Sequence, residues 1–200
     1  MTTRYWHYSK EPLRRVLPAP EQPAPGECRP GVGAGKPVGL WFSVGDAWRK
    51  WCRENDYETD GGVAVRTELS LDPGRFLVID GYGKLMDFDR EWSAPTGSGM
   101  SSCRIDWRGV AARWGGIVIA PYVWEARYEL LWYYGWDCAS GCVWDEGAAS
   151  VIGGQAIMAH ENLQVADGRD GEALPAPTRG VVRRGGAAQP SRGLARHARL

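Results

Sequence analysis

A tryptophan in a short strand is the clearest chemical signal in this sequence. Residues 38–43 (VGLWFS) alternate between two kinds of side chain, with the period of a strand that has one face on a core. Trp41 shares its face with Gly39 and Ser43, which are too small to fill a core. A flat ring between small neighbours suits the floor of a ligand cleft, where another ring can stack on it. The alternative, that Trp41 is part of the core, stays open.

A histidine near the N-terminus is the second candidate. His7 lies in the middle of residues 4–9 (RYWHYS), a run of aromatic and polar residues that predicts a strand. Its imidazole is either a ligand contact or a structural group satisfied by a backbone carbonyl group. The sequence alone leaves both interpretations open.

The strand at residues 38–43 leads into a predicted helix. Residues 44–46 (VGD) supply a turn glycine and an aspartate that can accept backbone N–H bonds at a helix start. Residues 47–53 follow with apolar side chains on one side and basic side chains on the other. We expect the Trp48–Trp51 pair on this helix to pack against the core.

The remaining elements are predicted from periodicity and turn residues. Strands are expected over 63–71, 75–80, 117–120 and 140–144, helices over 84–92 and 105–114, and a strand or helix over 151–157. The turn residues 72–74 (DPG) favour a hairpin between the first two strands. Residues 128–136 fit helix and strand equally well. Because strands and helices do not alternate regularly, we expect an α+β domain.

Length and residue bias predict one domain with a tail. Two hundred residues suffice for a single core, which we place at 1–165. Residues 17–37 are rich in proline and glycine and are expected to form a loop. Residues 166–200 contain no periodic apolar pattern and carry an excess of arginine, so we predict a disordered basic tail.

Composition narrows the possible partners and the compartment. Lysine and arginine total 24, as do the acidic residues, so bulk charge indicates neither a nucleic-acid nor a membrane partner. No run approaches the roughly 20 apolar residues of a membrane span. The 5 cysteines form no metal-binding pattern, and their odd number without a secretory leader favours free thiols. We therefore expect a cytoplasmic protein without a metal.

Three segments together resemble the ADP-ribosyltransferases of the diphtheria toxin and poly-ADP-ribose polymerase type. The first strand of that family reads W-H-G-S, and residues 6–9 read WHYS here. The second reads G-x-Y-F-[AS], followed by a helix with an aromatic residue, and residues 39–43 read GLWFS before Trp48. A late strand, E-x-[IV]-V-[YW], has the shape of residues 140–144 (SGCVW). The match covers about 25 residues in the first 145.

The resemblance implies a split β-sheet domain with a few short helices, and NAD as a co-substrate. By the resemblance, His7 holds the adenosine ribose. The nicotinamide stacks on Trp41, while backbone groups of Tyr8 hold its amide. Ser43 supports the site by hydrogen bonding, and Trp48 is the aromatic residue of the following helix.

The family's catalytic glutamate is not present at the matched position. Ser140 stands there, and a serine offers no charge. Transfer from NAD passes through a ribose-centred cation, which a preorganised carboxylate stabilises. Asp137 lies three residues earlier and is the first candidate, ahead of Asp145, which falls in a predicted turn, and Glu146. The alternative for each is a solvated turn residue.

Three functions remain open from the sequence. The first is a toxin-like mono-ADP-ribosyltransferase that modifies a macromolecular acceptor, either a protein or a nucleic acid. The second is a catalytically inactive relative that binds NAD, a nucleotide-like ligand or a partner protein. The third is a small structural or interaction protein whose tryptophans form a core and a partner surface.

Overall fold

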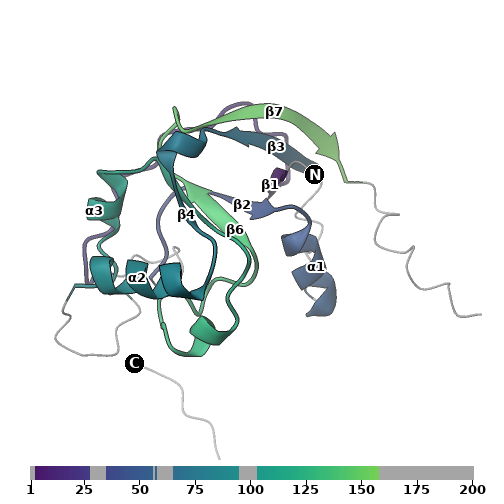
Figure 1. The fold of residues 1–200 in the computed structure, drawn as a ribbon. Coiled ribbons are helices and arrows are strands. Elements are labelled where there is room, and N and C mark those ends of the chain that lie inside the picture. The colour runs from purple at the N-terminus through teal and green to yellow at the C-terminus, as the bar shows by residue number, and fades with distance from the viewer. Residues whose placement is uncertain (1–2, 28–34, 56, 58–64, 95–102, 158–200) are drawn as a thin grey trace, which may run out of the picture. The chain divides into compact units, whose positions relative to one another are not determined.

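The computed structural model describes residues 3–27, 35–55, 57, 65–94 and 103–157. The chain divides into two units, Met1–Leu163 and Gln164–Leu200, and the second lies wholly outside the described residues. The predicted disordered tail at 166–200 therefore also lies outside them. The described residues all belong to the first unit, which Figure 1 shows in colour.

The first unit is a mixed α+β fold built on a curled sheet. Its seven strands are ordered β4-β5-β6-β2-β1-β3-β7. They span β1 Tyr5–Ser9, β2 Leu40–Val44, β3 Val65–Leu71, β4 Phe76–Ile79, β5 Gly116–Ile119, β6 Ser140–Val143 and β7 Ala149–Ala156. All neighbouring strands are antiparallel except β4 and β5. The sheet thus brings β1, β2 and β6, the three strands of the resemblance, next to one another.

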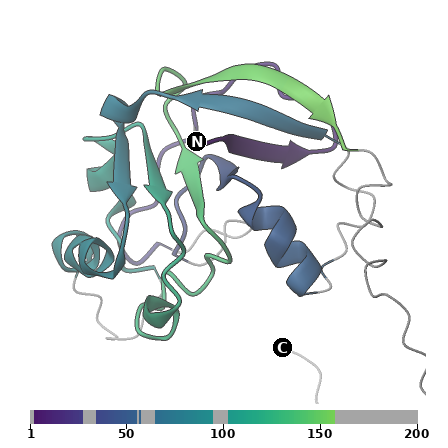
Figure 2. The ribbon, with the colours of Figure 1, turned by 45° about the vertical axis from the view of Figure 1, so that its right-hand side comes forward.

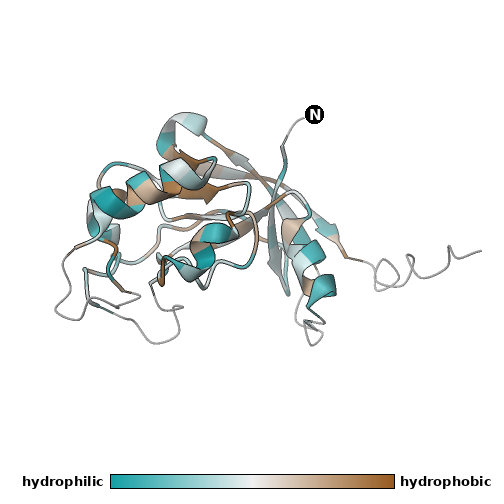
Figure 3. Ribbon diagram, turned by 60° about the horizontal axis from the view of Figure 1, so that its bottom comes forward, coloured by the Kyte–Doolittle hydropathy of each residue, from teal (hydrophilic) through white to brown (hydrophobic). Residues whose placement is uncertain are grey.

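Two hydrophobic clusters hold the sheet in place. One joins the sheet to α2 (Tyr82–Trp92), α3 (Trp107–Ala111) and the 3₁₀ turn η2 (Glu125–Tyr128). The other lies on the opposite face, where Phe42 of β2 contacts the rings of Tyr5 and Phe76. Figure 3 shows hydrophobic strand segments at the centre and hydrophilic residues on the helices. β5 is buried along its whole length and contributes side chains to both clusters.

Helix α1 (Ala47–Glu54) projects from the end of β2, apart from the other two helices (Figure 2). None of its residues is buried, so the expectation that Trp48 and Trp51 pack in the core is wrong. The two indoles stack on each other at 5.1 Å, and Tyr57 contacts both. The helix therefore covers its own apolar stripe with neighbouring aromatic rings.

The predicted hairpin is not formed. β3 pairs with β1 and β7, whereas β4 pairs with β5 in parallel. Residues 72–74 contribute instead to a 3₁₀ turn, Pro73–Arg75, which Asp72 caps by accepting from the Gly74 N–H. A parallel neighbour requires a crossover connection, and α2 and α3 provide it between β4 and β5.

The structure decides the secondary structure of three further segments. The segment 128–136 is neither helix nor strand beyond the end of η2, and consists mostly of turns. The helix predicted over 105–114 is shorter, and β7 decides the open choice over 151–157 in favour of a strand. None of the helices in the described part of the chain is long and apolar enough to cross a membrane.

The proline-rich segment is anchored to the core in its described parts. Gln22 is buried, and its side-chain amide donates to the carbonyl oxygen of Val38 and accepts from the N–H of Val38. Arg108 in turn donates to the carbonyl oxygen of Gln22. The loop prediction holds for 17–27 and 35–37, and within this loop partly buried hydrogen bonds hold Gln22 in place.

The cysteines depart from the expectation of free thiols. Cys103 is disulfide-bonded. Cys52, Cys138 and Cys142 are free. The expectation of free thiols is therefore confirmed for Cys52, Cys138 and Cys142 and is wrong for Cys103.

Candidate functional site

The sheet opens between β1 and β2. These strands pair at only two positions, Tyr5 with Val44 and Trp6 with Ser43, although β1 pairs with β3 along all its residues. Beyond Trp6 the two strands part. The fork that results is the structural basis of the site.

His7 bridges the fork. Its Nδ1 lies 2.8 Å from the carbonyl oxygen of Trp41. A carbonyl oxygen can only accept, so Nδ1 carries the proton and Nε2 of the neutral ring is left as an acceptor. The expectation of a backbone carbonyl partner is therefore confirmed, and it leaves one imidazole nitrogen for another contact.

The backbone of Tyr8 faces the open part of the fork. The Gly45 N–H donates to the Arg4 carbonyl oxygen, and Trp6 is paired with Ser43, so residues 4 and 6 direct their backbone groups at β2. Backbone direction alternates along a strand, so Tyr8 does the same. Pairing with β2 has ended before Tyr8, and the β1–β2 ladder supplies no partner there.

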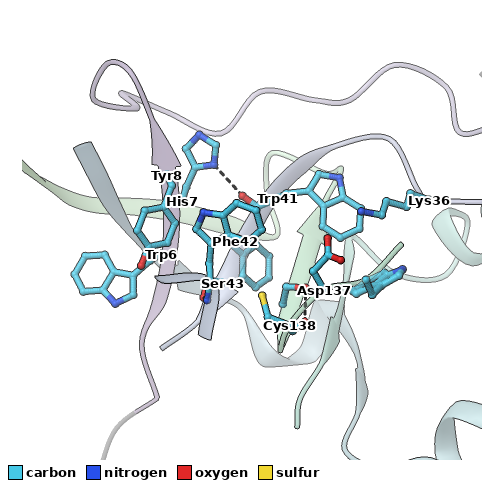
Figure 4. Close-up of a pocket in the computed structure, with 12 residues that line it drawn as sticks. Trp6, His7, Tyr8, Lys36, Trp41, Phe42, Ser43, Asp137 and Cys138 are labelled. Atoms are coloured by element: carbon cyan, nitrogen blue, oxygen red, sulfur yellow. Dashed lines mark hydrogen bonds between the residues drawn. The ribbon is translucent and has the colours of Figure 1, made fainter. Parts of the chain in front are cut away.

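A cavity of about 320 Å³ lies at this fork (Figure 4). Paired residues of neighbouring strands point to the same face of the sheet. Trp6, Ser43 and Ser140 are paired across three strands and form one row on this face. Trp41 precedes Ser43 by two residues and lies in the next row of the same face. The cavity is lined by Trp6, His7, Tyr8, Lys36, Trp41, Phe42, Ser43, Trp48, Trp136, Asp137, Cys138 and Ser140.

The seven residues singled out from the sequence all line this cavity, namely His7, Tyr8, Trp41, Ser43, Trp48, Asp137 and Ser140. The other two carboxylates, Asp145 and Glu146, do not. Asp145 accepts from Arg75 and from the Gly147 N–H, which makes it the turn residue that the sequence predicted. Lys36, Trp136 and Cys138 also line the cavity but were not predicted as site residues. The sequence offered only their neighbours as a signal: Lys36 precedes Pro37, and Trp136 and Cys138 flank Asp137.

Ser43 sets the position of Trp48. Its hydroxyl donates to the Gly45 carbonyl oxygen and accepts from the Trp48 N–H. Asp46 was expected to accept backbone N–H bonds at this helix start, yet its side chain makes no such bond. Ser43 therefore orients the beginning of α1, and with it the indole that α1 contributes to the cavity.

Ser140 is engaged by the backbone of its own strand end. Its hydroxyl donates to the carbonyl oxygen of Cys138 at 2.9 Å. The hydroxyl proton is thereby used, and only the lone pairs of the oxygen remain for a ligand. Ser140 can accept a hydrogen bond in the cavity but supplies no charge.

The charged groups of the cavity wall are Lys36 and Asp137. The ammonium of Lys36 lies over the Trp41 ring, 5.0 Å from its centroid. Burial raises the pKa of Asp137, while the charges of Lys36 and Arg127 oppose that rise. Burial likewise lowers the pKa of Lys36, and Asp137 opposes that shift. Each group thus favours the charged form of the other.

Two buried polar atoms of the cavity residues have no hydrogen-bond partner in the part of the chain that the structure describes. They are the hydroxyl of Tyr8 and the indole N–H of Trp136. Burial raises the pKa of Tyr8 to about 12, so its hydroxyl keeps the proton and can donate. A buried unsatisfied group costs about 1–3 kcal/mol, and a ligand that bonds to it recovers that cost.

The thiol chemistry of the cavity is weak. Burial raises the pKa of Cys138 to about 12, and the pKa of the fully buried Cys142 is raised as well. The thiolate is the nucleophile and the metal ligand, so neither cysteine is activated near neutral pH. In the described part of the chain, no three His, Cys, Asp or Glu side chains are grouped to hold a metal ion.

We expect His7 to make unfolding depend on pH. Burial lowers its pKa below the ordinary value of about 6.5, and the Trp41 carbonyl opposes the shift only in part. The stability from neutral His7 is complete above about pH 6.5 and is lost as pH falls toward the lowered pKa, because the unfolded chain binds the proton more readily.

Urea unfolding at about pH 5 and pH 7 measures this dependence, with His7→Gln as the comparison. The wild type should lose more free energy of unfolding at the lower pH than the variant does. An NMR titration midpoint for His7 at or above about 6.5 would contradict the assignment.

No protein-family model, curated protein or solved structure was found to match this chain.

Proposed function

We propose that the protein is a mono-ADP-ribosyltransferase that uses NAD as co-substrate. It would transfer ADP-ribose to a macromolecular acceptor, a protein or a nucleic acid, and release nicotinamide. One observation carries the proposal. Seven residues from three distant segments line a single cavity: six were chosen by their resemblance to such enzymes, and Asp137 was chosen as the carboxylate three residues before the matched position.

The sheet supports the same proposal. A split β-sheet is expected of an ADP-ribosyltransferase-like fold, and here β1 and β2 are paired at two positions only. The fork separates a β1-β3-β7 part from a β4-β5-β6-β2 part. The cavity lies at this separation, where a ligand can reach backbone groups that a continuous sheet would bury.

Each part of the donor has a candidate partner. Nε2 of His7 would accept from a hydroxyl of the adenosine ribose, and the backbone of Tyr8 would hold the carboxamide. The Trp41 ring would carry the nicotinamide, since an indole attracts a cationic ring. The Asp137 carboxylate would stabilise the positive charge that develops on the ribose.

The size of the cavity sets the placement of the donor. About 320 Å³ is near the lower limit of small-molecule sites, which span roughly 300–1,000 Å³. We therefore place the nicotinamide and its ribose within the cavity. The adenosine half would extend along the fork past His7.

Ser140 favours a second candidate, a catalytically inactive relative that binds NAD or a similar ligand. The hydroxyl occupies the glutamate position of the family and is bonded to the Cys138 carbonyl oxygen. In that case Asp137 would contribute charge to binding but not to transfer.

Replacement of Trp41 tests the site. Losing the stacking surface should weaken NAD binding by about tenfold to a hundredfold, since aromatic contacts with bases are worth roughly 1–3 kcal/mol. Calorimetry gives the affinity, and release of nicotinamide from labelled NAD gives the transfer rate. Trp124→Ala is the matched control, because Trp124 is exposed outside the cavity.

The outcomes separate the two candidates. Binding with nicotinamide release supports the transferase, and binding without release supports the inactive relative. If wild type and Trp41→Ala bind NAD equally, or if neither binds it, the cavity is not an NAD site.

A further inference from the structure

Lys36 is held firmly at the cavity although no motif predicted it. The indole N–H of buried Trp107 donates to the carbonyl oxygen of Gly35, at 2.9 Å. Two residues after Lys36, the buried amide of Gln22 bonds to both backbone groups of Val38. The backbone is thus fixed on both sides of Lys36, which limits where its side chain can reach.

Trp41 and Gly135 fix the position of the Lys36 side chain. Its ammonium lies over the Trp41 ring, 5.0 Å from the ring centroid. Figure 4 shows the end of the Lys36 side chain at this ring. Its stem passes over Gly135, where an added Cβ would come within 2.9 Å of the Lys36 Cε. Gly135 therefore leaves room for the aliphatic part of Lys36. This arrangement brings one positive charge to the nicotinamide position proposed above.

We propose, on the basis of the NAD-transfer function above, that Lys36 is a catalytic residue that uses its positive charge to expel nicotinamide. The nicotinamide ring of NAD carries a positive charge, and the free base does not. An ammonium beside the ring disfavours the bound donor relative to the separated base. The repulsion is relieved as the bond to the ribose breaks.

The transfer breaks one bond to C1′ of the ribose and forms another. The bond between C1′ of the ribose and the ring nitrogen breaks, and both electrons stay on the nitrogen, giving neutral nicotinamide. The positive charge passes to C1′ and the ring oxygen of the ribose, where Asp137 stabilises it. A lone pair of the acceptor then forms the new bond to C1′, and the acceptor's proton leaves to solvent. No oxidant or metal is required.

The two charges on the cavity wall thereby divide the work. Lys36 raises the free energy of charge on the base, and Asp137 lowers the free energy of charge on the sugar. Interactions that improve as charge moves accelerate the chemical step, whereas those that are constant affect only binding. Lys36 should therefore weaken binding of NAD while raising its rate of cleavage.

A comparison of NAD with NADH isolates this charge. The two share phosphates and adenosine, but the reduced nicotinamide ring is neutral. The affinities of wild type, Lys36→Met and Lys36→Arg are measured for both by calorimetry, and nicotinamide release from NAD gives kcat. Methionine keeps an unbranched stem over Gly135 and removes the charge, while arginine keeps the charge.

Lys36→Met should shift the preference toward NAD by about tenfold, as a unit charge at this separation predicts for a partly hydrated site. Its kcat should fall by about the same factor while NAD binds more tightly. Lys36→Arg should change the preference little. A purely structural lysine would not improve NAD binding on its removal.

Three results would overturn the role of Lys36. An equal loss of affinity for NAD and NADH would indicate that Lys36 contacts the phosphates. An unchanged preference between the two would show that its charge does not act on the nicotinamide ring. An unchanged kcat in Lys36→Met would show that Lys36 takes no part in catalysis. If the wild type binds neither nucleotide, the proposed function itself fails, and the role of Lys36 with it.

A wild-type measurement covers the case in which Lys36→Met does not fold. Nicotinamide and N1-methylnicotinamide, which has a permanent ring charge, are compared as competitors of NAD binding. The neutral ring should compete about tenfold better. Equal competition, or better competition by the charged ring, would contradict the proposal.

Discussion

Asp137→Asn should lower NAD cleavage by about a hundredfold to a thousandfold, the usual cost of losing one group that stabilises transition-state charge. Asparagine keeps the size of the side chain and removes its charge. The effect should fall on kcat, because the ribose gains its positive charge only as the bond breaks. Asp137 is the carboxylate that lines the cavity; burial raises its pKa, and the charges of Lys36 and Arg127 oppose that rise.

Asp145→Asn is the matched control for this experiment. Asp145 was the rival carboxylate in the sequence, but it bonds to Arg75 and the Gly147 N–H outside the cavity. Its replacement should leave kcat within about twofold, since an exposed ion pair contributes at most about 1 kcal/mol, and to stability. Equal losses in the two variants, or full activity in Asp137→Asn, would exclude Asp137 as the catalytic carboxylate.

Gly141→Ala should destabilise the fold by about 3 kcal/mol, because a methyl group has no space there. An added Cβ would lie 2.4 Å from both the carbonyl oxygen of Ile117 and the ring of Phe42. Gly141 pairs with Phe42 of β2 and Val118 of β5, so neither neighbour can move without disturbing the central sheet. Thermal unfolding should show a melting temperature lower by about 6–12 °C.

Gly153→Ala provides the comparison on an exposed strand. Gly153 lies in β7, and an added Cβ would meet nothing within 4 Å. Its stability should change by less than about 1 kcal/mol, since only the entropy of the unfolded chain differs. Similar melting temperatures for the two variants would show that the close contacts at Gly141 do not restrict the strand.

Local patterns predicted most strands but not their partners. Residues 63–71 and 75–80 were both expected as strands, and β3 and β4 form there. Their pairing was predicted from a three-residue turn, whereas the chain pairs β4 with β5 across a crossover. Periodicity reports which side of an element is buried, and pairing depends on residues far away in the chain.

The aromatic segments were the hardest to interpret. Residues 128–136 (YELLWYYGW) carry aromatic or leucine side chains at every position except Glu129 and Gly135, so neither a period of two nor one of 3.6 stands out. Buried Trp132, Tyr133 and Trp136 there pack into the main core from turns. The stripe on α1 showed a clear helical period, yet it is covered by Tyr57 rather than by the core.

The strands of the site and its carboxylate Asp137 were predictable from the sequence, whereas its positive charge, Lys36, was not. His7 and Trp41 lie on strands that the sequence indicated. Alternation along β2 places Trp41 on the same face of the sheet as Ser43, and both line the cavity. Lys36 precedes the strand by several residues, and nothing in its spacing indicates that it folds over Trp41. That contact depends on the anchors at Gly35 and Val38, which come from Trp107 and Gln22.

The indole N–H signals of the tryptophans test the central claim most directly. They are followed by NMR during titration with an NAD analogue in which carbon replaces the ribose ring oxygen, so that no transfer occurs. The signals of Trp41, Trp48 and Trp136 should shift together with one affinity, and those of Trp114 and Trp124, outside the cavity, should not. No shift, or shifts confined to Trp114 and Trp124, would contradict an NAD site at the fork.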